Sequence, residues 1–516
     1  MKARPRLRRL IDVLQAWHAR LPESADVFLD LFTSNELGSY RDVDLLKQAS
    51  EELSETFQTL RDVVKVIETA SFELTSSYRR AANHILPPMK LPFEVLGSIF
   101  ETACQPSQWN EHVEVYPNAA VILAKCRQTR LAIGSSCSHF RQVLLNTPTA
   151  WSHISVSMDY GEPTTPSHAL VPLEVARGKA SPVHLYVFDE RAIYSQAMWY
   201  WKSVKDSLYS LQGRLQTLLI TSDGSCRTVP PLIFLSGDFL LPALKTIHVA
   251  IRQNPLPAYV DIRGAPALET LDIEYARVTV NIPPPLSIMC HPTSSIRELR
   301  IHGGINVDDT LNLLASCHQS LEAFRWTVPI GTPFNLPIPR TPHLLPNLRK
   351  LYLDVPSPLS LLHPSRNIMP NLAELALDKW TQSVEHDVDP GVISLPSLDF
   401  MSIGSEGFLN AVLEPFFRAN PTIQEIITAA NIDDVARFFR DADPTQDELL
   451  PRLEHLDFGP ASAYPDIVLP LFRAIRRRQN PFRVCFHSLP HGFDEQLLVE
   501  YGDIVLIEDP TLISTQ

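Results

Sequence analysis

The sequence predicts an α/β protein in which a helical N-terminal part is followed by repeated units that stack on one curved parallel sheet. Three observations predict this fold: a long segment without proline or glycine, short apolar segments that recur regularly beyond about residue 180, and a proline in front of most of these segments. The chain has 516 residues, 45% of them hydrophobic, which is enough apolar material for several cores. The predicted divisions are a basic, partly disordered N-terminus (1–39), a long helix (40–84), a small helical domain (85–157), the repeats (165–505) and a C-terminal tail (506–516).

The segment from Tyr40 to Arg80 is predicted to be one amphipathic helix. Apolar residues recur at alternating spacings of three and four, which is the period of a helix that buries one face. One position of this seam holds Leu46, Leu53, Leu60, Ile67 and Leu74, and the other holds Phe57, Val64 and Tyr78 together with Ser50 and Ser71. Two interpretations stay open, a short coiled coil and an intramolecular helix lying on the next domain. The helix should end at Pro87 and Pro88, because proline lacks the backbone donor.

A second helical unit is predicted after these prolines. The segment 91–100 begins with Leu91-Pro92 and places its apolar residues on one helical face, with Leu96 and Ile99 expected to point inward and Pro92 outward. A second helical pattern runs from Leu131 to Leu144 and closes with the segment 146–154.

Beyond residue 180 the chain is predicted to be a repeat. Segments of the form apolar-x-x-apolar-x-apolar begin about 24 to 30 residues apart. Their first residues are Leu215, Leu244, Leu268, Ile296, Leu321, Leu348, Leu372, Leu398, Ile423 and Leu453, with Phe482 as a looser eleventh. The interval is close to the leucine-rich-repeat period of about 20 to 29 residues.

The segments between the repeats support the same prediction. A proline before most strands, as in Leu241-Pro242-Ala243, should stop the preceding helix and give the chain an extended entry into the strand. Helix-like runs occupy 308–317, 408–419 and 467–478. One strand with one return segment cannot bury its apolar face alone, so the units are expected to stack into a solenoid. The alternative, unrelated strands of an ordinary α/β domain, needs the spacing and the prolines to recur by coincidence.

The segment from Leu86 to Ile154 resembles an F-box, in particular the F-box-like domain common in the genomes of mushroom-forming fungi. Three blocks carry the resemblance: Leu91-Pro92-x-Glu94-Val95-Leu96-x-x-Ile99-Phe100, then residues 137–143 in place of the family's Cys-Arg-x-Trp-Arg-x-Ile, then Thr147-Pro148-x-x-Trp151-x-x-Ile154. The departures are Phe140, where the family often has Trp, and a longer polar insertion from about Gln105 to Gln128. The repeats are similar to the leucine-rich-repeat domains attached to such F-boxes.

The resemblance implies a substrate-receptor subunit of a Skp-cullin-F-box ubiquitin ligase. In that family the F-box docks on a Skp-type adaptor carried by a cullin scaffold, and the repeats hold the protein to be ubiquitinated. The residues implied in the adaptor contact are Leu91, Pro92, Glu94, Val95, Leu96, Ile99, Phe100 and Phe140. Two alternatives stay open: the same residues form the private core of a small helical domain, or the chain is a leucine-rich-repeat scaffold with a degenerate F-box that engages no ligase.

Strand alternation predicts which side chains lie on the concave face of the sheet, where an unknown protein substrate is expected to bind. The middle of this face should be cationic and aromatic, with acids at its border. The residues expected to contact the partner are Arg300, His302, Arg325, Lys350, Tyr352 and Asp354. Arginine and tyrosine are among the residue types most often found at binding hot spots. The alternative is a solvated sheet face whose charges only keep the repeats soluble.

Composition and motifs argue against several function classes. The net charge of −13 argues against nucleic acid as a partner, and no apolar run approaches the length of a membrane span. The basic start, from Lys2 to Arg9, is either a targeting address or a solvated tail. The seven scattered cysteines predict neither disulfides nor a metal site, which favours the cytosol or the nucleus. Phosphate-loop, nucleophile-elbow and zinc-helix motifs are absent from the sequence, so no cofactor and no enzymatic activity are expected.

Overall fold

A computed structural model of the chain describes most residues from Tyr40 to Ile507. The described ranges are 40–85, 87–106, 116–157, 167–189, 209–222, 240–252, 259–276, 287–290, 294–303, 305, 307–328, 342–378, 389–404, 410–429, 432–441, 449–458, 465–486 and 499–507. The predicted N-terminal tail and most of the predicted C-terminal tail lie outside these ranges. The described residues form two compact units, one containing the chain up to Ile99 with Ala132–Leu144, the other containing Phe100–Leu131 and the chain from Leu145 onward.

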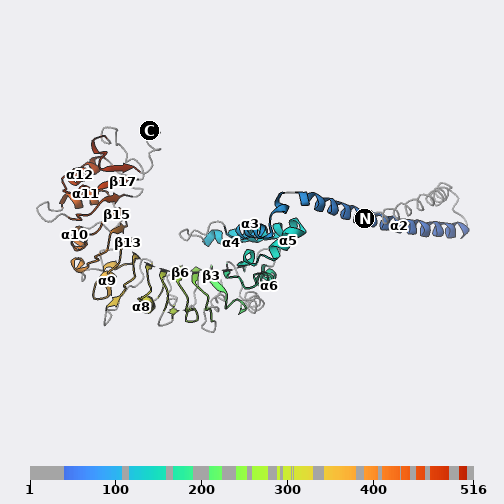
Figure 1. Cartoon of the computed structure of the whole chain (residues 1–516), viewed down its shortest axis with the longest axis horizontal. Coiled ribbons are helices and arrows are strands. Elements are labelled where there is room, and N and C mark those ends of the chain that lie inside the picture. Colours follow the sequence, from blue (N-terminus) through green and yellow to red (C-terminus); the bar gives the residue numbers. More distant parts are fainter. Residues whose placement is uncertain are drawn as a thin grey trace. The chain divides into compact units, whose positions relative to one another are not determined.

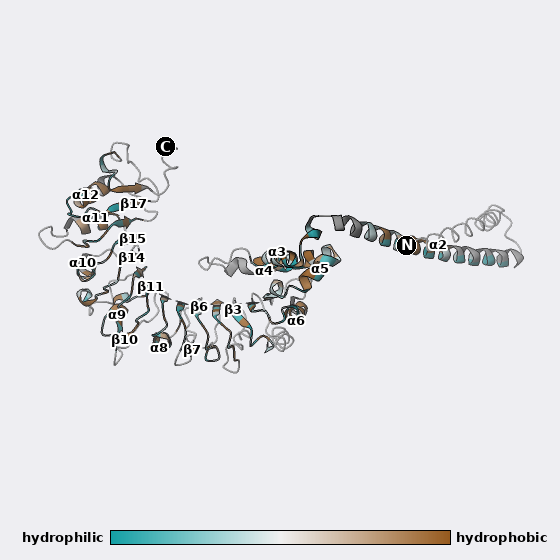
Figure 2. Ribbon diagram, in the orientation of Figure 1, coloured by the Kyte–Doolittle hydropathy of each residue, from teal (hydrophilic) through white to brown (hydrophobic). Residues whose placement is uncertain are grey.

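The first unit is helical. Helix α2 (Tyr40–Ile85) is 46 residues long, which confirms the predicted helix, and the 3-10 helix η1 (Pro87–Lys90) follows it at the two prolines. Helix α3 (Phe93–Cys104), whose residues from Phe100 onward belong to the second unit, begins just after Pro92, whose carbonyl oxygen accepts a hydrogen bond from Leu96 N at 3.1 Å. Figure 2 shows mainly hydrophilic colouring along α2 and hydrophobic colouring on α3.

The segment from Leu131 to Leu144, predicted to be helical, is helical in the structure but not as one continuous helix. The structure has two helices, α4 (Tyr116–Ser136) and α5 (Ser138–Leu145), separated at Cys137. Helix α4 begins inside the segment from about Gln105 to Gln128, which was predicted to be a polar insertion. Its hydrophobic residues are not gathered on one face, and for this reason periodicity did not reveal it.

The second unit contains one large parallel sheet of 14 strands (Figure 1). The strands follow one another in chain order: β1 (His153–Ser157), β2 (Val183–Asp189), β3 (Leu215–Ser222), β4 (Thr246–Arg252), β6 (Thr270–Ala276), β8 (Glu298–Gly303), β9 (Ala323–Thr327), β11 (Lys350–Asp354), β13 (Glu374–Leu377), β14 (Phe400–Ile403), β15 (Glu425–Thr428), β16 (His455–Asp457), β17 (Arg483–Phe486) and β18 (Val505–Ile507). All eleven predicted segments form strands of this sheet, so the predicted parallel order is confirmed. The strands β1, β2 and β18 extend it beyond the recognised repeats.

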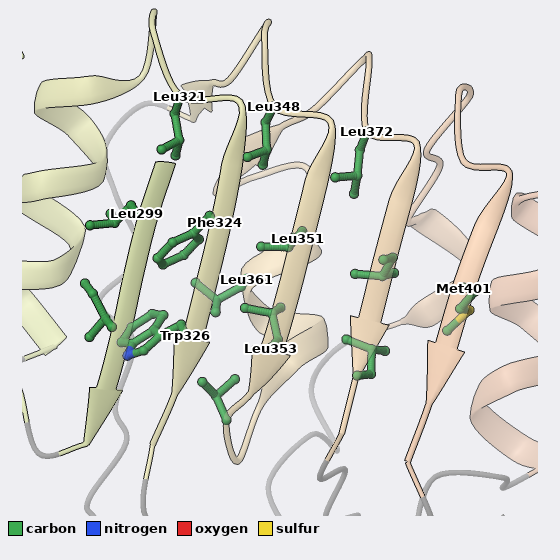
Figure 3. Close-up of a cluster of buried hydrophobic side chains, with 14 of the residues drawn as sticks. Leu299, Leu321, Phe324, Trp326, Leu348, Leu351, Leu353, Leu361, Leu372 and Met401 are labelled. Carbon is green, nitrogen blue, oxygen red and sulfur yellow. The ribbon is translucent and has the colours of Figure 1, made fainter. Parts of the chain in front are cut away.

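The core lies on one face of this sheet. Leu299, Phe324 and Leu351 share one row of the register, and all three are buried. Figure 3 shows this stacking, with the leucines that precede successive strands, such as Leu348 and Leu372, at matching positions. Each side chain is therefore covered by its equivalents in the neighbouring units, as the alternation of apolar residues predicts.

Helices and short strands lie on the outer side of the second unit. Figure 1 shows the sheet strands along the inner side of a curve, with α8 (Val307–Cys317), α9 (Pro358–Leu362) and α10 (Asn410–Ala419) along its outer side. Further helices of this unit in the described ranges include α6 (Ser167–Arg177), α11 (Ile432–Asp441) and α12 (Pro465–Arg476). Two short parallel pairs, β5 (Tyr259–Asp261) with β7 (Ser287–Met289) and β10 (His343–Leu344) with β12 (Asn367–Ile368), complete it. Every helix in the described ranges is too short or too polar to cross a membrane.

The prolines before the strands lie in tight turns, not in the extended segments expected from the sequence. Leu244 N donates to Leu241 O at 3.1 Å and Leu398 N donates to Leu395 O at 3.0 Å, so Pro242 and Pro396 occupy the second position of a β-turn. The fixed φ of proline suits this position.

Polar residues in these turns join one unit to the next. The Asn371 amide donates to Pro346 O at 2.7 Å, and the Ser397 hydroxyl donates to Pro370 O at 2.8 Å. The residue after the turn proline is therefore a connection between consecutive units.

Two arginines of α4 cover the first edge of the sheet. Arg127 donates to Ser155 O at 2.8 Å, and Arg130 donates to His153 O at 3.1 Å, so both satisfy carbonyls of strand β1. Glu174 of α6 lies 2.9 Å from each guanidinium. An open strand edge invites pairing with other chains, and this cluster closes it. No local sequence pattern indicates this cluster, because its members lie up to 47 residues apart in the chain.

A pair of stacked histidines lies on the first two strands. The rings of His153 and His184 are 4.6 Å apart, with His153 Nδ1 3.0 Å from the Tyr186 hydroxyl and His184 Nδ1 2.9 Å from the Thr217 hydroxyl. Burial, with smaller contributions from His184 and Arg130, lowers the pKa of His153 to about 3. Both histidines are therefore neutral at physiological pH, because burial also lowers the pKa of His184.

Candidate functional site

Two surfaces contain the residues singled out by the sequence. The first lies on α3 and on the turn before it. Leu91 precedes the helix by two residues, Val95 and Ile99 lie on it four apart, and the three are 38%, 43% and 47% exposed. Leu96 and Phe100, also four apart, are buried. Residues four apart lie on the same side of a helix, so α3 has one buried apolar side, with Leu96 and Phe100, and one exposed apolar side, with Val95 and Ile99.

This arrangement corrects two expectations. The apolar residues of segment 91–100 do not form one face, and Ile99 points outward, whereas Leu96 is inward and Pro92 exposed as expected. We call Leu91, Val95 and Ile99, with the neighbouring Phe93 at 38% exposure, the α3 apolar surface. Phe93 was not among the predicted residues, because it stands at an unspecified position of the motif Leu91-Pro92-x-Glu94.

The remaining residues of this first set surround the α3 apolar surface or lie on α5. Glu94 is exposed on the first turn of α3, where a negative charge stabilises the helix dipole. Phe140 is half-buried on α5. The Cys137 sulfur lies 4.0 Å from the Met89 sulfur, which places the start of α5 beside η1.

The second surface lies on the sheet, on the face opposite the core. The strands β8, β9 and β11 are neighbours, and their register puts Arg300, Arg325 and Tyr352 in one row. His302 and Asp354 belong to the next row, and Lys350 begins the third strand. The structure thus brings together all six predicted residues, which we call the inner-face patch.

Two of the three cations in the inner-face patch are neutralised by neighbours. Arg300 Nε donates to Glu298 Oε1 at 2.8 Å, and its Nη1 lies 3.9 Å from Asp272 Oδ2. Lys350 Nζ lies 2.8 Å from Glu374 Oε1. The positive charge predicted for this region is therefore partly compensated within the sheet, a feature that strand alternation does not reveal.

Arg325 is the third cation. Its guanidinium carbon lies 4.2 Å above the Tyr352 ring, and the Tyr352 hydroxyl donates to Asp378 Oδ2 at 3.1 Å. Burial, together with Asp378, raises the pKa of Tyr352 to about 12, so the hydroxyl keeps its proton and this hydrogen bond. Among the described residues, no carboxylate lies within ion-pair distance of Arg325, whose side chain is exposed. A guanidinium held flat on a ring keeps its donors in a fixed direction.

The other two members differ in accessibility. His302 is half-buried, and burial, as the main cause, lowers its pKa, so its imidazole is neutral near pH 7. Asp354 is 3% exposed, so its carboxylate lies below the surface that a partner would meet. The accessible centre of the inner-face patch therefore consists of Arg325 and Tyr352, with paired charges around it.

The described residues show no constellation for metal chemistry. Within the described ranges, no three side chains of His, Cys, Asp or Glu come close enough together to hold a metal ion. No model of a known protein family and no curated protein matches this chain. Function has to be inferred from the α3 apolar surface and the inner-face patch themselves.

Proposed function

We propose that the chain is the substrate-receptor subunit of a Skp-cullin-F-box ubiquitin ligase. In this proposal the α3 apolar surface docks on a Skp-type adaptor, and the inner-face patch of a leucine-rich-repeat-like solenoid captures the target protein. The observation that carries the proposal is the outward position of Leu91, Val95 and Ile99, since a small helical domain with a private core would bury them.

The size of the α3 apolar surface fits a docking contact. Full burial of a leucine, valine or isoleucine side chain contributes about 1.5 to 3 kcal/mol. Leu91, Val95 and Ile99 keep about two fifths of their surface exposed, so their burial against an adaptor would contribute about 2 to 4 kcal/mol together. A few large side chains that carry most of the energy are typical of a helix bound in a groove.

The arrangement of the sheet supports the solenoid in this proposal. Each strand pairs in parallel with the strands of the preceding and following units, and each unit buries its leucines against theirs. Such stacks present a long open face to partners, as leucine-rich-repeat domains do. The enzymatic step would then belong to other subunits, and this chain would act by holding its target.

Adaptor docking is tested by binding of a purified Skp-type adaptor to the full chain. The triple variant Leu91→Ala, Val95→Ala, Ile99→Ala is expected to weaken binding by a factor between about 30 and 1,000, the equivalent of 2 to 4 kcal/mol. The matched control is Val121→Ala with Leu131→Ala, which truncates two exposed apolar side chains of α4 and should leave binding unchanged. Equal binding by the triple variant and the wild type would contradict docking through α3.

Association with the ligase separates the proposal from its alternative. A substrate receptor co-purifies with the adaptor and the cullin from cells, whereas a scaffold with a degenerate F-box co-purifies with neither. Tagged wild-type chain and the triple variant are compared in the same experiment. Recovery of the cullin with the wild type and its loss with the triple variant is the expected result.

Target capture is tested separately by proximity labelling. Arg325→Gln removes the exposed guanidinium above Tyr352 and is expected to reduce labelling of the captured protein while adaptor binding persists. The control is Arg437→Gln on α11, because Arg437 is a surface arginine with an exposed partner, Asp434. Identical labelling by all three chains would remove the inner-face patch from the proposal.

A further inference from the structure

Helix α2 is longer than its described neighbours require. At about 1.5 Å per residue, its 46 residues span about 70 Å. The described element that it mainly contacts is η1, at its C-terminal end. Helices in water derive most of their stability from packing an apolar face, so a helix of this length is expected to have a partner along its body.

The seam of α2 is exposed. Phe57, Leu74 and Tyr78 are 68%, 70% and 75% exposed, and Val64 and Ile67 are nearly half exposed. Val63 is buried, but it lies on the flank of the seam. The chain itself therefore covers this flank of α2 and leaves the seam exposed. The seam is therefore the side of α2 that a partner would cover.

We propose that α2 pairs with α2 of a second copy of this chain in a parallel, in-register coiled coil. The seam follows the heptad period, with the partly buried Leu60 and the exposed Ile67 and Leu74 in one set of layers, and Phe57, Val64, Ser71 and Tyr78 in the other. A spacing that averages 3.5 residues matches a second helix, because it keeps the seam facing that helix along its whole length. Leucine at the first set of positions is typical of parallel dimers.

The order of the layers selects the parallel register. In a parallel pair each layer meets its own copy, so the polar Ser71 faces Ser71 of the second chain. In an antiparallel pair the two sets of positions face each other, so Ser71 faces a residue of the first set, such as Ile67, which sets a hydroxyl against an apolar side chain. A polar layer that can pair only with itself is a known determinant of register.

The flanks of the seam do not oppose this pairing. In a parallel coiled coil a residue on one flank faces the residue five positions later on the other helix. This places Val63 opposite Glu68 and Ala70 opposite Thr75. These pairs bring no like charges together, so charge repulsion does not counteract the apolar seam.

The mass of the purified full chain in solution tests the pairing. The wild type is expected at twice 58.0 kDa by light scattering or sedimentation at micromolar concentration. Ile67→Glu with Leu74→Glu should give the monomer mass. The matched control, Thr69→Glu with Ser76→Glu, adds the same two charges at the same spacing on the opposite side of the helix and should remain a dimer. A monomeric wild type would overturn the proposal, as would a dimer that persists in the seam variant.

Oxidative cross-linking tests the register. Leu74→Cys is expected to form a disulfide-linked dimer that exceeds the wild-type background, because only a parallel in-register pair brings position 74 next to itself. Thr69→Cys, on the outer side, is the control and should not. A dimeric mass without a cross-link at position 74 would overturn the parallel register. Both measurements use the purified chain without an adaptor, so their outcome is independent of the proposed ligase function.

Discussion

Replacing Glu174 by glutamine is expected to destabilise the start of the second unit by about 3 to 5 kcal/mol. Glu174 is 3% exposed, and its carboxylate lies 2.9 Å from the guanidinium groups of Arg127 and Arg130, which are 15% and 2% exposed. Glutamine keeps the shape but not the charge, and would leave two guanidinium groups without the carboxylate that balances them. Removal of one partner from a buried ion pair typically costs this amount.

The measurement is hydrogen–deuterium exchange of the backbone amides of β1 and β2, because a chain of this length need not unfold in one step. A loss of 3 to 5 kcal/mol accelerates exchange by a factor between about 100 and several thousand. The control is Glu269→Gln, whose partner Lys245 is 52% exposed, and which should cost less than about 1 kcal/mol. If Glu174→Gln exchanged no faster than Glu269→Gln, the closure of the sheet edge by this buried cluster would be refuted.

Three further predictions concern stability. His153 has a folded pKa of about 3, below its unfolded value near 6.5, so the unfolded state binds more protons between these two values. The free energy of unfolding should therefore fall by about 1.4 kcal/mol per pH unit as the pH drops from about 6 to 3. In urea unfolding at each pH, His153→Phe should show a correspondingly shallower loss. Gly303 has a φ of +103°, and a Cβ there would lie 1.8 Å from the Tyr275 carbonyl oxygen. Gly303→Ala should therefore lower the free energy of unfolding, measured by thermal unfolding, by at least about 2 kcal/mol. Gly213→Ala is the control and should not lower it, because the space around Gly213 is open. Asn420 is 1% exposed and makes three hydrogen bonds to backbone groups, so Asn420→Ala should cost about 3 kcal/mol, and a cost no larger than that of Asn371→Ala at the surface would contradict this account.

The strands of the sheet were predictable because their signal is local. A segment such as Leu348-Arg349-Lys350-Leu351-Tyr352-Leu353 has leucine at its first, fourth and sixth positions, and a similar spacing of apolar residues returns in each recognised unit. The prolines were equally visible, but their conformation was not. Pro242 lies in a β-turn and not in an extended segment, since a fixed φ is compatible with both and the hydrogen bond that closes the turn decides between them.

The candidate surfaces were predictable in part. Alternation identified Arg325 and Tyr352 as neighbours on the open face of the sheet, because strand register follows from the repeat. It could not show that Arg300 and Lys350 are neutralised by Glu298 and Glu374, since the pairing of long side chains depends on their rotamers and on the neighbouring strand.

The sequence by itself determined that this chain has a long N-terminal helix and a parallel sheet whose strands follow chain order. Both follow from local patterns, because the spacing of apolar residues and the position of a proline influence the backbone within a few residues. The tertiary structure alone decided which apolar face of α3 is buried, that Arg127, Arg130 and Glu174 close the first edge of the sheet, and that the seam of α2 lies open. These features depend on what surrounds each side chain. Hydrophobic residues at helical spacing indicate that one face of the helix is buried. Which face is buried, and against which partner, is decided by contacts between segments far apart in the chain.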